Sequence, residues 1–485
     1  MEKTTVHLPT AQNKVIILGA GVAGLHMAAQ LRQRGIKDIV LLEKSDRAGG
    51  KVETIHSQGV AYDMGPVLIT SAYRHVKEAL RQYCPENREI PRNMGRKTRY
   101  AITNLTSDPS TLEGGDYVDW MTAEMHKAMG GTHSSLSKTT WCVLKAAWQY
   151  LKIHRRIFPN HRDGLPPRPN TTDLTLLAQQ NTLQFLQQHN LEVLTPLFDE
   201  AQTGQGYGSL SDVPALYALW WTTPTLIWAF VKSHLPWGTP LETILEHGYQ
   251  PLFEGMIQQE KLEISLNVDI THIDRNHSGA HPIHVEGIQN GTKVSYNGDF
   301  LICACPAEDL LPLIKEPSQR EQEIFPQLQT LVATSTLFRA QVPQHYWTNT
   351  VLLHNPIGNH RLLVFRTPKA DLNNNRREDN DLFVAYQYGE QDTTLEEINH
   401  TMLQNLHEIG VKEIRIEHCR KHRYFPHFGR QAIERGYPWE IFAMQGHNRT
   451  WWIGSSACFE SVNEVFAYNK QVLDTYFVAT ERKSI

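Results

Sequence analysis

The chain has 485 residues, of which 40% are hydrophobic and 20% are charged, and its formal net charge is −4. This balance is typical of a globular protein with two or three domains, and it argues against nucleic-acid binding, which needs clustered basic charge. The six cysteines and 24 histidines show no metal-ligand spacing, so we expect no metal site. So few cysteines in a long chain favour a reducing compartment.

Two features of the sequence bear on where the protein resides. The N-terminal segment has no apolar signal core, and no run approaches the ~18 apolar residues of a membrane-spanning helix. We therefore expect a cytoplasmic protein, with peripheral membrane contact left open. The sequence leaves the oligomeric state undecided.

The first elements of the chain predict a strand, a glycine turn, a helix and a second strand. An apolar run leads into the turn of residues 19–24, and an amphipathic segment and a second apolar run follow. Gly19 permits the tight turn, Gly21 lets a pyrophosphate approach the backbone, and Gly24 lets helix and strand pack closely. The helix N-terminus offers free N–H groups to the pyrophosphate, so the unit predicts dinucleotide binding.

The second apolar run ends in Glu43, where a carboxylate can accept hydrogen bonds from ribose hydroxyls. A second glycine turn follows, in which Arg47 precedes Gly49 and Gly50. Together these residues resemble the glutamate–arginine–glycine–glycine signature of FAD enzymes in the amine oxidase, protoporphyrinogen oxidase and phytoene desaturase superfamily. The resemblance implies an α/β fold with a Rossmann-like FAD-binding domain of the GR2, or amine-oxidase, type. It implies cofactor contacts from Gly19, Gly21, Ala23, Gly24, Glu43, Lys44, Arg47, Gly49, Gly50, Lys51, Gly65, Pro66, Val268, Gly454, Val462 and Asn463.

A helix is expected at 72–83, followed by a basic run at 92–99. Residues 104–130 are polar and glycine-rich, and this composition predicts a surface loop.

The next predicted helix, at 134–158, is basic and rich in tryptophan. Its apolar face is formed by Trp141, Leu144, Trp148 and Leu151. Such a helix can lie on a membrane surface. We favour the alternative, in which the apolar face packs into a cap domain and the basic side is solvated.

A strongly apolar and aromatic segment follows at 213–237, after a glycine-rich stretch at 204–208. Aromatic residues at this density form a protein core or line a long apolar substrate pocket. The sequence leaves both interpretations open.

The C-terminal half of the chain is predicted to alternate strands with a few helices. Strands are expected at 283–288, 292–296, 299–306, 335–341, 361–366, 382–388, 414–420 and 451–454. Helices are expected at 395–408 and 463–477, and a polar loop at 371–381. We accordingly expect a discontinuous FAD-binding domain (12–100, 240–306 and 440–485), a helical cap or substrate domain (101–239) and an α+β substrate-domain sheet (307–439).

Several motifs outside the FAD signature resemble the bacterial polyenoic fatty acid isomerases. They include the glycine–tyrosine–glycine of residues 206–208 and the tyrosine–phenylalanine–proline–histidine of residues 424–427. This branch of the superfamily is also similar to fungal β-cyclopiazonate dehydrogenases. The resemblance implies an FAD-dependent enzyme that moves a hydride from an apolar substrate, as an isomerase or a dehydrogenase of unsaturated fatty acids. The alternatives are an amine or amino-acid oxidase and a non-catalytic flavin-binding protein that binds a membrane or a partner.

The same resemblance implies the substrate-binding residues. An arginine of the 92–99 run would bind the substrate carboxylate, because a guanidinium suits a carboxylate. Arg96 is the first choice and Arg99 the second. The other expected substrate contacts are Gln205, Tyr207, Trp220, Tyr424 and His427. No catalytic side chain is assigned, because the flavin carries the chemistry. Cys458 is the candidate for a covalent flavin link, but its sequence context differs from that of covalent relatives, so we expect FAD to be held non-covalently.

Overall fold

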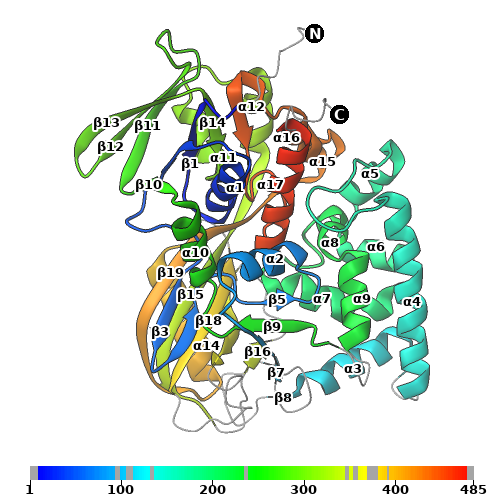
Figure 1. The fold of residues 1–485 in the computed structure, drawn as a ribbon. Coiled ribbons are helices and arrows are strands. Elements are labelled where there is room, and N and C mark those ends of the chain that lie inside the picture. The colour runs from blue at the N-terminus through cyan, green and yellow to red at the C-terminus, as the bar shows by residue number, and fades with distance from the viewer. Residues whose placement is uncertain are drawn as a thin grey trace.

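Figure 1 shows the computed structural model of the chain. It describes residues 9–92, 99–104, 113–131, 136–233, 239–343, 349–352, 359–368, 381–389 and 393–477. Two large sheets dominate these residues, and a group of helices lies to one side of them.

A five-stranded parallel sheet with the order β10-β2-β1-β14-β20 forms the centre of the first part. Its strands are β1 (Lys14–Leu18), β2 (Asp38–Leu42), β10 (Glu263–Ser265), β14 (Phe300–Cys303) and β20 (Thr450–Trp452). The apolar runs predicted two strands joined by a glycine turn and a helix. The side chains from Val15 to Leu18 are fully buried, as is usual in a parallel sheet covered on both faces. Helix α1 (Val22–Gln33) packs against both α10 (Gln250–Glu260) and α17 (Val462–Tyr476). The predicted Rossmann-like fold is therefore confirmed.

The second large sheet has seven strands in the order β19-β15-β18-β17-β16-β7-β8. They are β7 (Arg99–Asn104), β8 (Glu113–Asp116), β15 (Leu328–Gln341), β16 (Asn349–Leu352), β17 (Asn359–Arg366), β18 (Leu382–Gly389) and β19 (Lys412–Phe428). Helix α14 (Leu395–Glu408) packs against β17 and β19. All neighbours are antiparallel except β16 and β7, which run parallel.

Smaller elements surround these sheets. The remaining strands are β3 (Thr54–Ser57), β4 (Val60–Asp63), β5 (Ile69–Thr70), β6 (Glu89–Pro91), β9 (Glu242–Leu245), β11 (Val268–Asp274), β12 (Ile283–Gln289) and β13 (Thr292–Gly298). The remaining helices near the sheets are α2 (Arg74–Tyr83), α11 (Ala307–Leu310), α12 (Gln319–Ile324), α15 (Arg430–Glu434) and α16 (Tyr437–Ala443).

The helical part is built from residues 117–233. Its helices are α3 (Tyr117–Ala128), α4 (Leu136–Ile157), α5 (Thr171–Gln179), α6 (Thr182–Gln188), α7 (Thr195–Ala201), α8 (Ala215–Trp221) and α9 (Pro224–Ser233). The predicted loop at 104–130 is wrong for its second half, which forms β8 and α3. The side chain of Asp116 caps α3 by accepting the backbone N–H groups of Val118 and Asp119.

The favoured expectation that the apolar face of α4 packs into the cap domain is wrong for three of its four residues. Leu151 is buried in the helical part, but Trp141, Leu144 and Trp148 are exposed to solvent. The buried face of α4 is instead formed by residues such as Ala147 and Tyr150. Helical spacing predicts which side chains of α4 share a face. The position of the neighbouring helices decides which face is buried.

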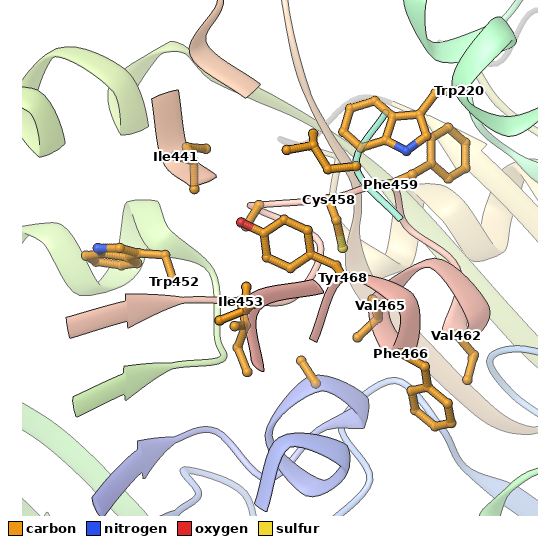
Figure 2. Close-up of a cluster of buried hydrophobic side chains, with 14 of the residues drawn as sticks. Trp220, Ile441, Trp452, Ile453, Cys458, Phe459, Val462, Val465, Phe466 and Tyr468 are labelled. Carbon is orange, nitrogen blue, oxygen red and sulfur yellow. The ribbon is translucent and has the colours of Figure 1, made fainter. Parts of the chain in front are cut away.

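The aromatic segment at 213–237 forms core in its first half. Trp220 of α8 is 2% exposed and its indole N–H donates to the backbone oxygen of Gly164 at 2.7 Å. Figure 2 shows Trp220 beside Phe459, at the edge of a cluster that also holds Cys458, Tyr468 and residues from the start of α17. This cluster belongs to a hydrophobic core that runs from the parallel sheet into the helical part, so the two parts share one core.

Candidate functional site

A cavity of about 540 Å³ lies where the parallel sheet meets the seven-stranded sheet. At one end it is lined by the turns that follow the carboxyl ends of the parallel strands. At the other end it is lined by Ala333, Val364, Tyr386 and their neighbours from the seven-stranded sheet. Ligands of open α/β sheets bind in the crevice outside the carboxyl ends of the strands, so this is the expected place for a dinucleotide.

The two glycine turns lie against each other at the floor of the cavity. The Gly49 N–H donates to the backbone oxygen of Ala20 at 2.8 Å, and Gly21 forms a β-bridge with Gly49. A Cβ added to Gly50 would lie 3.0 Å from the Gly21 Cα, and Gly50 has a positive φ of 57°. Side chains at these positions would fill the space between the two turns, so this backbone cradle suits a close-lying pyrophosphate.

Glu43 faces the cavity with its carboxylate already positioned. It accepts the Ala20 N–H at 2.8 Å and the Ser45 N–H at 2.9 Å, as well as the Ser45 hydroxyl. Its backbone oxygen accepts the Val268 N–H at 2.8 Å, so Val268 supports the strand end from behind. Lys44 points to solvent, where it pairs with Asp269 at 3.0 Å, and it does not line the cavity.

Arg47 lines the cavity and also holds the second glycine turn together. Its guanidinium donates to the backbone oxygens of Val52 at 2.8 Å and Gly50 at 2.7 Å. Burial lowers the pKa of Arg47 from its ordinary value, although nearby Glu53 acts in the opposite direction. In this structure the arginine of the signature shapes the loop.

The other residues expected at the cofactor divide into two groups. Those that line the cavity are Gly19, Gly21, Ala23, Lys51, Gly65, Pro66, Gly454 and Val462. Gly24, Gly49, Val268 and Asn463 support the lining from outside it. A Cβ at Gly24 would lie 2.0 Å from the Gly19 oxygen, so only glycine lets the helix and the strand pack this closely. The Asn463 side chain accepts the His75 backbone N–H at 3.0 Å.

An aromatic wall closes the part of the cavity beyond the glycine turns. The rings of Tyr207 and Tyr424 stack with centroids 5.6 Å apart and an interplanar angle of 9°. The Tyr424 hydroxyl donates to the backbone oxygen of Gln205 at 2.9 Å. Gly206 has a φ of 81°, and a Cβ there would lie 2.1 Å from the ring of Tyr388, so only glycine at this position lets the turn approach that ring.

Two residues expected at the substrate lie elsewhere. Trp220 and His427 are buried in the core and do not line the cavity. The His427 ring bonds the backbone oxygen of Phe425 at 2.8 Å and stacks on the Phe425 ring, so the end of β19 uses it for packing. Among the described residues of 213–233, none lines the cavity either, and this segment is therefore core.

The predicted carboxylate clamp involves Arg96 and Arg99. Arg96 lies outside the described residues. Arg99 lines the cavity, but Glu200 already pairs with it through two contacts of 3.0 Å. The Tyr117 hydroxyl donates to the same carboxylate, and the Arg99 guanidinium lies 3.9 Å from the Tyr117 ring centroid. Burial alone would lower the pKa of Arg99, but Glu200 and Tyr117 raise it above its ordinary value.

The Arg99–Glu200 pair makes a prediction for stability. Replacing Glu200 by glutamine should leave the Arg99 charge buried without a counter-charge, and should lower the free energy of unfolding by about 3–5 kcal/mol. Urea denaturation measures this change. Glu246→Gln is the matched control, since Glu246 pairs with the exposed Arg88 and should cost less than about 1 kcal/mol. Equal losses in both variants would contradict the assignment of Arg99 to a buried pair.

One cavity residue that sequence reasoning missed is Arg366, at the end of β17. It is 5% exposed and lines the cavity, and its Nε has no hydrogen-bond partner. Among the described residues, no carboxylate lies within 4 Å of its guanidinium, which sits 5.7 Å from the Tyr386 ring centroid. A signal was present, because an arginine ending the apolar strand run at 361–366 is a buried charge that requires a partner or a ligand.

The carboxylates and the other arginines of the cavity are all engaged. Arg92 pairs with Glu242 at 2.7 Å, and Arg420 pairs with Glu53 at 2.6 Å. Glu460 pairs with Lys51 and also accepts the Phe425 backbone N–H. Together with Glu43 and Glu200, Glu460 completes the carboxylates that line the cavity within the described part of the chain.

The first turn of α17 closes the cavity beside the glycine turns. Ser461 caps this helix by accepting the Glu464 N–H, and Ser461 and Val462 line the cavity. The partial positive charge of the helix N-terminus therefore faces the cavity. Glu464 points away from it, and its carboxylate accepts the Gly164 N–H at 2.6 Å.

Glu464 predicts a pH dependence of stability. Burial, followed by the nearby charge of Asp163, raises the pKa of Glu464 from 4.5 to about 8. The folded state then holds a proton that the unfolded state has lost, so stability falls as the pH rises toward 8. From pH 6.5 to 8.5 the wild type should lose about 2 kcal/mol more than Glu464→Gln, measured by urea denaturation. Parallel pH profiles for the two proteins would contradict the raised pKa.

No helix of the described ranges is both long and apolar enough to cross a bilayer. The described residues also contain no group of three or more histidine, cysteine, aspartate or glutamate side chains arranged to hold a metal ion.

The chain is similar in sequence to a protein family and to several known proteins. A family model for flavin containing amine oxidoreductase matches residues 22–359, more than half of the chain. A polyenoic fatty acid isomerase from Ptilota filicina is 23% identical over 503 residues, which cover 96% of this chain and 95% of the relative. A 1-hydroxycarotenoid 3,4-desaturase from a Flavobacterium species is 40% identical, but only over 73 residues that cover 15% of this chain and 14% of that one.

Solved structures resemble the whole chain. A CLA-producing fatty acid isomerase from P. acnes has a TM-score of 0.75 at 21% identity and covers 97% of this chain and 100% of its own. Putrescine oxidase bound to putrescine has a TM-score of 0.62 at 15% identity, with coverage of 96% and 99%. At such identities the likeness establishes the fold, and it does not choose between these activities.

Proposed function

Because the chain belongs to the flavin-containing amine oxidoreductase family, we propose that it holds FAD non-covalently in the cavity and isomerises or dehydrogenates an unsaturated fatty acid. Family membership confirms the FAD-enzyme superfamily that the two glycine turns predicted. FAD, when bound, supplies a ring system that exchanges a hydride with a carbon of the substrate. The residues of the chain bind and orient the reactants and exclude water.

The residues at the turns fit this cofactor. The Gly21–Gly50 cradle admits a pyrophosphate, and Glu43 stands at the end of β2 with an oriented carboxylate. The N-terminus of α17 presents positive partial charge to the cavity, where it would stabilise negative charge on a bound group. The glycine turns, the oriented Glu43 carboxylate and the α17 N-terminus together support dinucleotide binding in the cavity.

The cysteines near the site support a non-covalent cofactor. Cys458 does not line the cavity, and its thiol donates to the Gly454 backbone oxygen within the cluster shown in Figure 2. Burial raises the pKa of Cys458 well above its ordinary value. Cys305 lines the cavity, but burial raises its pKa to about 12. Since the thiolate is the nucleophile, neither side chain is activated for bond formation.

The observation that carries the substrate assignment is the balance of free charge in the cavity. Each described carboxylate there has a partner, whereas the buried Arg366 has no carboxylate partner among the described residues. The site is therefore prepared for an anionic group, and a guanidinium binds a carboxylate through two parallel hydrogen bonds. Apolar side chains beside Arg366, among them Val351, Leu363 and Val364, suit an alkyl chain.

The same inventory argues against an amine substrate. An amine oxidase needs a place for a cationic or neutral amine near the flavin, and an aromatic pair often forms such a place. Here the Tyr207 and Tyr424 rings stack directly on each other at 5.6 Å, which leaves no slot for a third group between them. The carboxylates that could bind an ammonium group are occupied by Arg99, Lys51 and backbone N–H groups.

A substrate panel tests this assignment. The purified flavoprotein is incubated in air with a polyunsaturated fatty acid, its methyl ester and a diamine such as putrescine. We expect the free acid to be converted, as seen by chromatography, and the ester to react poorly. Conversion of the amine, with hydrogen peroxide released, would contradict the proposal. Binding of flavin without conversion of any compound would favour the non-catalytic alternative.

A further inference from the structure

Four exposed apolar side chains lie on two neighbouring helices of the helical part, and none of them lines the cavity. Trp141, Leu144 and Trp148 of α4 are 68%, 43% and 59% exposed, and Trp228 of α9 is 47% exposed. Spacings of three and four residues place the three α4 side chains on one side of the helix. Helices α4 and α9 pack against each other, and Figure 1 shows α4 at the outer edge of the helical part. We refer to these four residues as the α4–α9 face.

Basic side chains surround this face, and acidic ones are absent from its helices. Helix α4 spans 22 residues and contains five lysines and arginines but no aspartate or glutamate. Helix α9 contains Lys232 and no acidic residue. The Lys152 ammonium lies 3.2 Å from the centroid of the Trp148 ring, so apolar and basic groups are interleaved. Arg156, near the C-terminal end of α4, pairs with Asp173 at 3.2 Å.

We propose that the α4–α9 face binds the surface of a bilayer that contains anionic lipid. Tryptophan rings concentrate at the boundary between headgroups and hydrocarbon, because they offer an apolar body and a polar N–H. Lysine and arginine beside them are attracted to anionic headgroups. A helix with this distribution lies in the plane of the interface. This agrees with the finding that no described helix can cross a bilayer.

Charge favours a lipid surface over a second copy of the chain. In a two-fold symmetric dimer through this face, the lysines of one α4 would lie near those of the other. Like charges brought together across an interface oppose association. An anionic bilayer instead neutralises the basic groups and covers the tryptophans at the same time. Exposed apolar patches of this kind mark interaction surfaces, and here the surrounding charge selects the partner.

Vesicle sedimentation with the full-length flavoprotein tests the proposal. We expect binding to phosphatidylglycerol vesicles, about tenfold or more weaker binding to phosphatidylcholine vesicles, and weaker binding in high salt. The double variant Trp141→Ser/Trp148→Ser and the double variant Lys145→Glu/Lys152→Glu should each lower the affinity for phosphatidylglycerol vesicles by about tenfold or more. All four residues are exposed, so flavin content and thermal stability should stay at wild-type values.

The control is Ile288→Ser/Leu395→Ser, which removes two other exposed apolar side chains that lie outside α4 and α9. It should bind phosphatidylglycerol vesicles as the wild type does. Failure of the wild type to sediment with these vesicles would overturn the proposal, as would equal losses in the control and the tryptophan variant. A wild-type dimer that becomes monomeric in the tryptophan variant, without vesicle binding, would assign the face to a second copy instead. None of these outcomes depends on the proposed substrate.

Discussion

Leucine in place of Arg366 is expected to lower kcat/KM for a free unsaturated fatty acid by about 100- to 1,000-fold, because truncating one partner of a buried, charge-assisted contact costs about 2–5 kcal/mol. The guanidinium would otherwise bind the substrate carboxylate in the apolar part of the cavity, so most of the loss should appear in KM. Steady-state kinetics with the acid and with its methyl ester measure the effect. The ester, which carries no charge, should lose little.

Two further variants make the Arg366 experiment specific. Arg366→Lys keeps the charge but loses the planar fork, and it should fall between wild type and leucine. Arg361→Leu is the matched control, because Arg361 begins the same apolar run of β17 but is exposed. It should behave as the wild type does. If Arg366→Leu and the wild type had the same kcat/KM for the acid, carboxylate recognition by Arg366 would be wrong.

Alanine in place of Gly21 is expected to weaken FAD binding by about 100-fold, or roughly 2.7 kcal/mol, while the protein still folds. A Cβ at Gly21 would meet only the Gly50 Cα, at an ordinary 3.7 Å, and Gly21 does not have a positive φ. The added methyl group would nevertheless occupy the cradle in which the pyrophosphate is expected. Flavin content after purification and titration of the apoprotein with FAD measure the effect.

Two other glycine variants separate cofactor binding from folding. Gly24→Ala should lower the yield of folded protein, because the Cβ of the alanine would lie 2.0 Å from the backbone oxygen of Gly19. Gly115→Ala should change neither property, since nothing lies within 4 Å of its Cβ. Circular dichroism and thermal unfolding identify the folded variants. Gly21→Ala with normal FAD affinity would contradict the placement of the pyrophosphate against the two turns.

The parallel sheet and its turns could be predicted from the sequence because their signals are local. Buried parallel strands appear as short apolar runs. Gly19, Gly21 and Gly24 each meet one local requirement for a residue without a side chain. The sequence likewise predicts the helix at 395–408 to the residue, and the structure shows a local capping box of Thr394 and Glu397 at its start. Such features need no knowledge of the distant parts of the chain.

The substrate end of the cavity could not be predicted in the same way, because partners distant in sequence decide it. Arg99 resembled a free carboxylate ligand until Glu200, 101 residues away, was found beside it. Arg366 ends an apolar run and so indicates a charge near the core, but only the folded sheet places it in the cavity. Trp220 and the aromatic residues around it have the composition of a substrate pocket, but packing against Phe459 makes them core.

The exposed face of α4 illustrates the same limit on the surface. Trp141 and Leu151 share a helical stripe in sequence, yet one is exposed and the other is buried. Periodicity identifies an apolar stripe but does not say how much of its length the neighbouring helices cover. The part left uncovered is the part that we assign to a lipid surface.

Anaerobic mixing with a polyunsaturated fatty acid, while flavin and conjugated-diene absorbance are recorded together, tests most directly the proposal that this protein exchanges a hydride with an unsaturated fatty acid through bound FAD. Diene formation over many turnovers with the flavin oxidised at the end is the result expected of an isomerase, and stoichiometric flavin bleaching that recovers in air is the result expected of a dehydrogenase. An unchanged flavin spectrum without any conjugated product would contradict the claim.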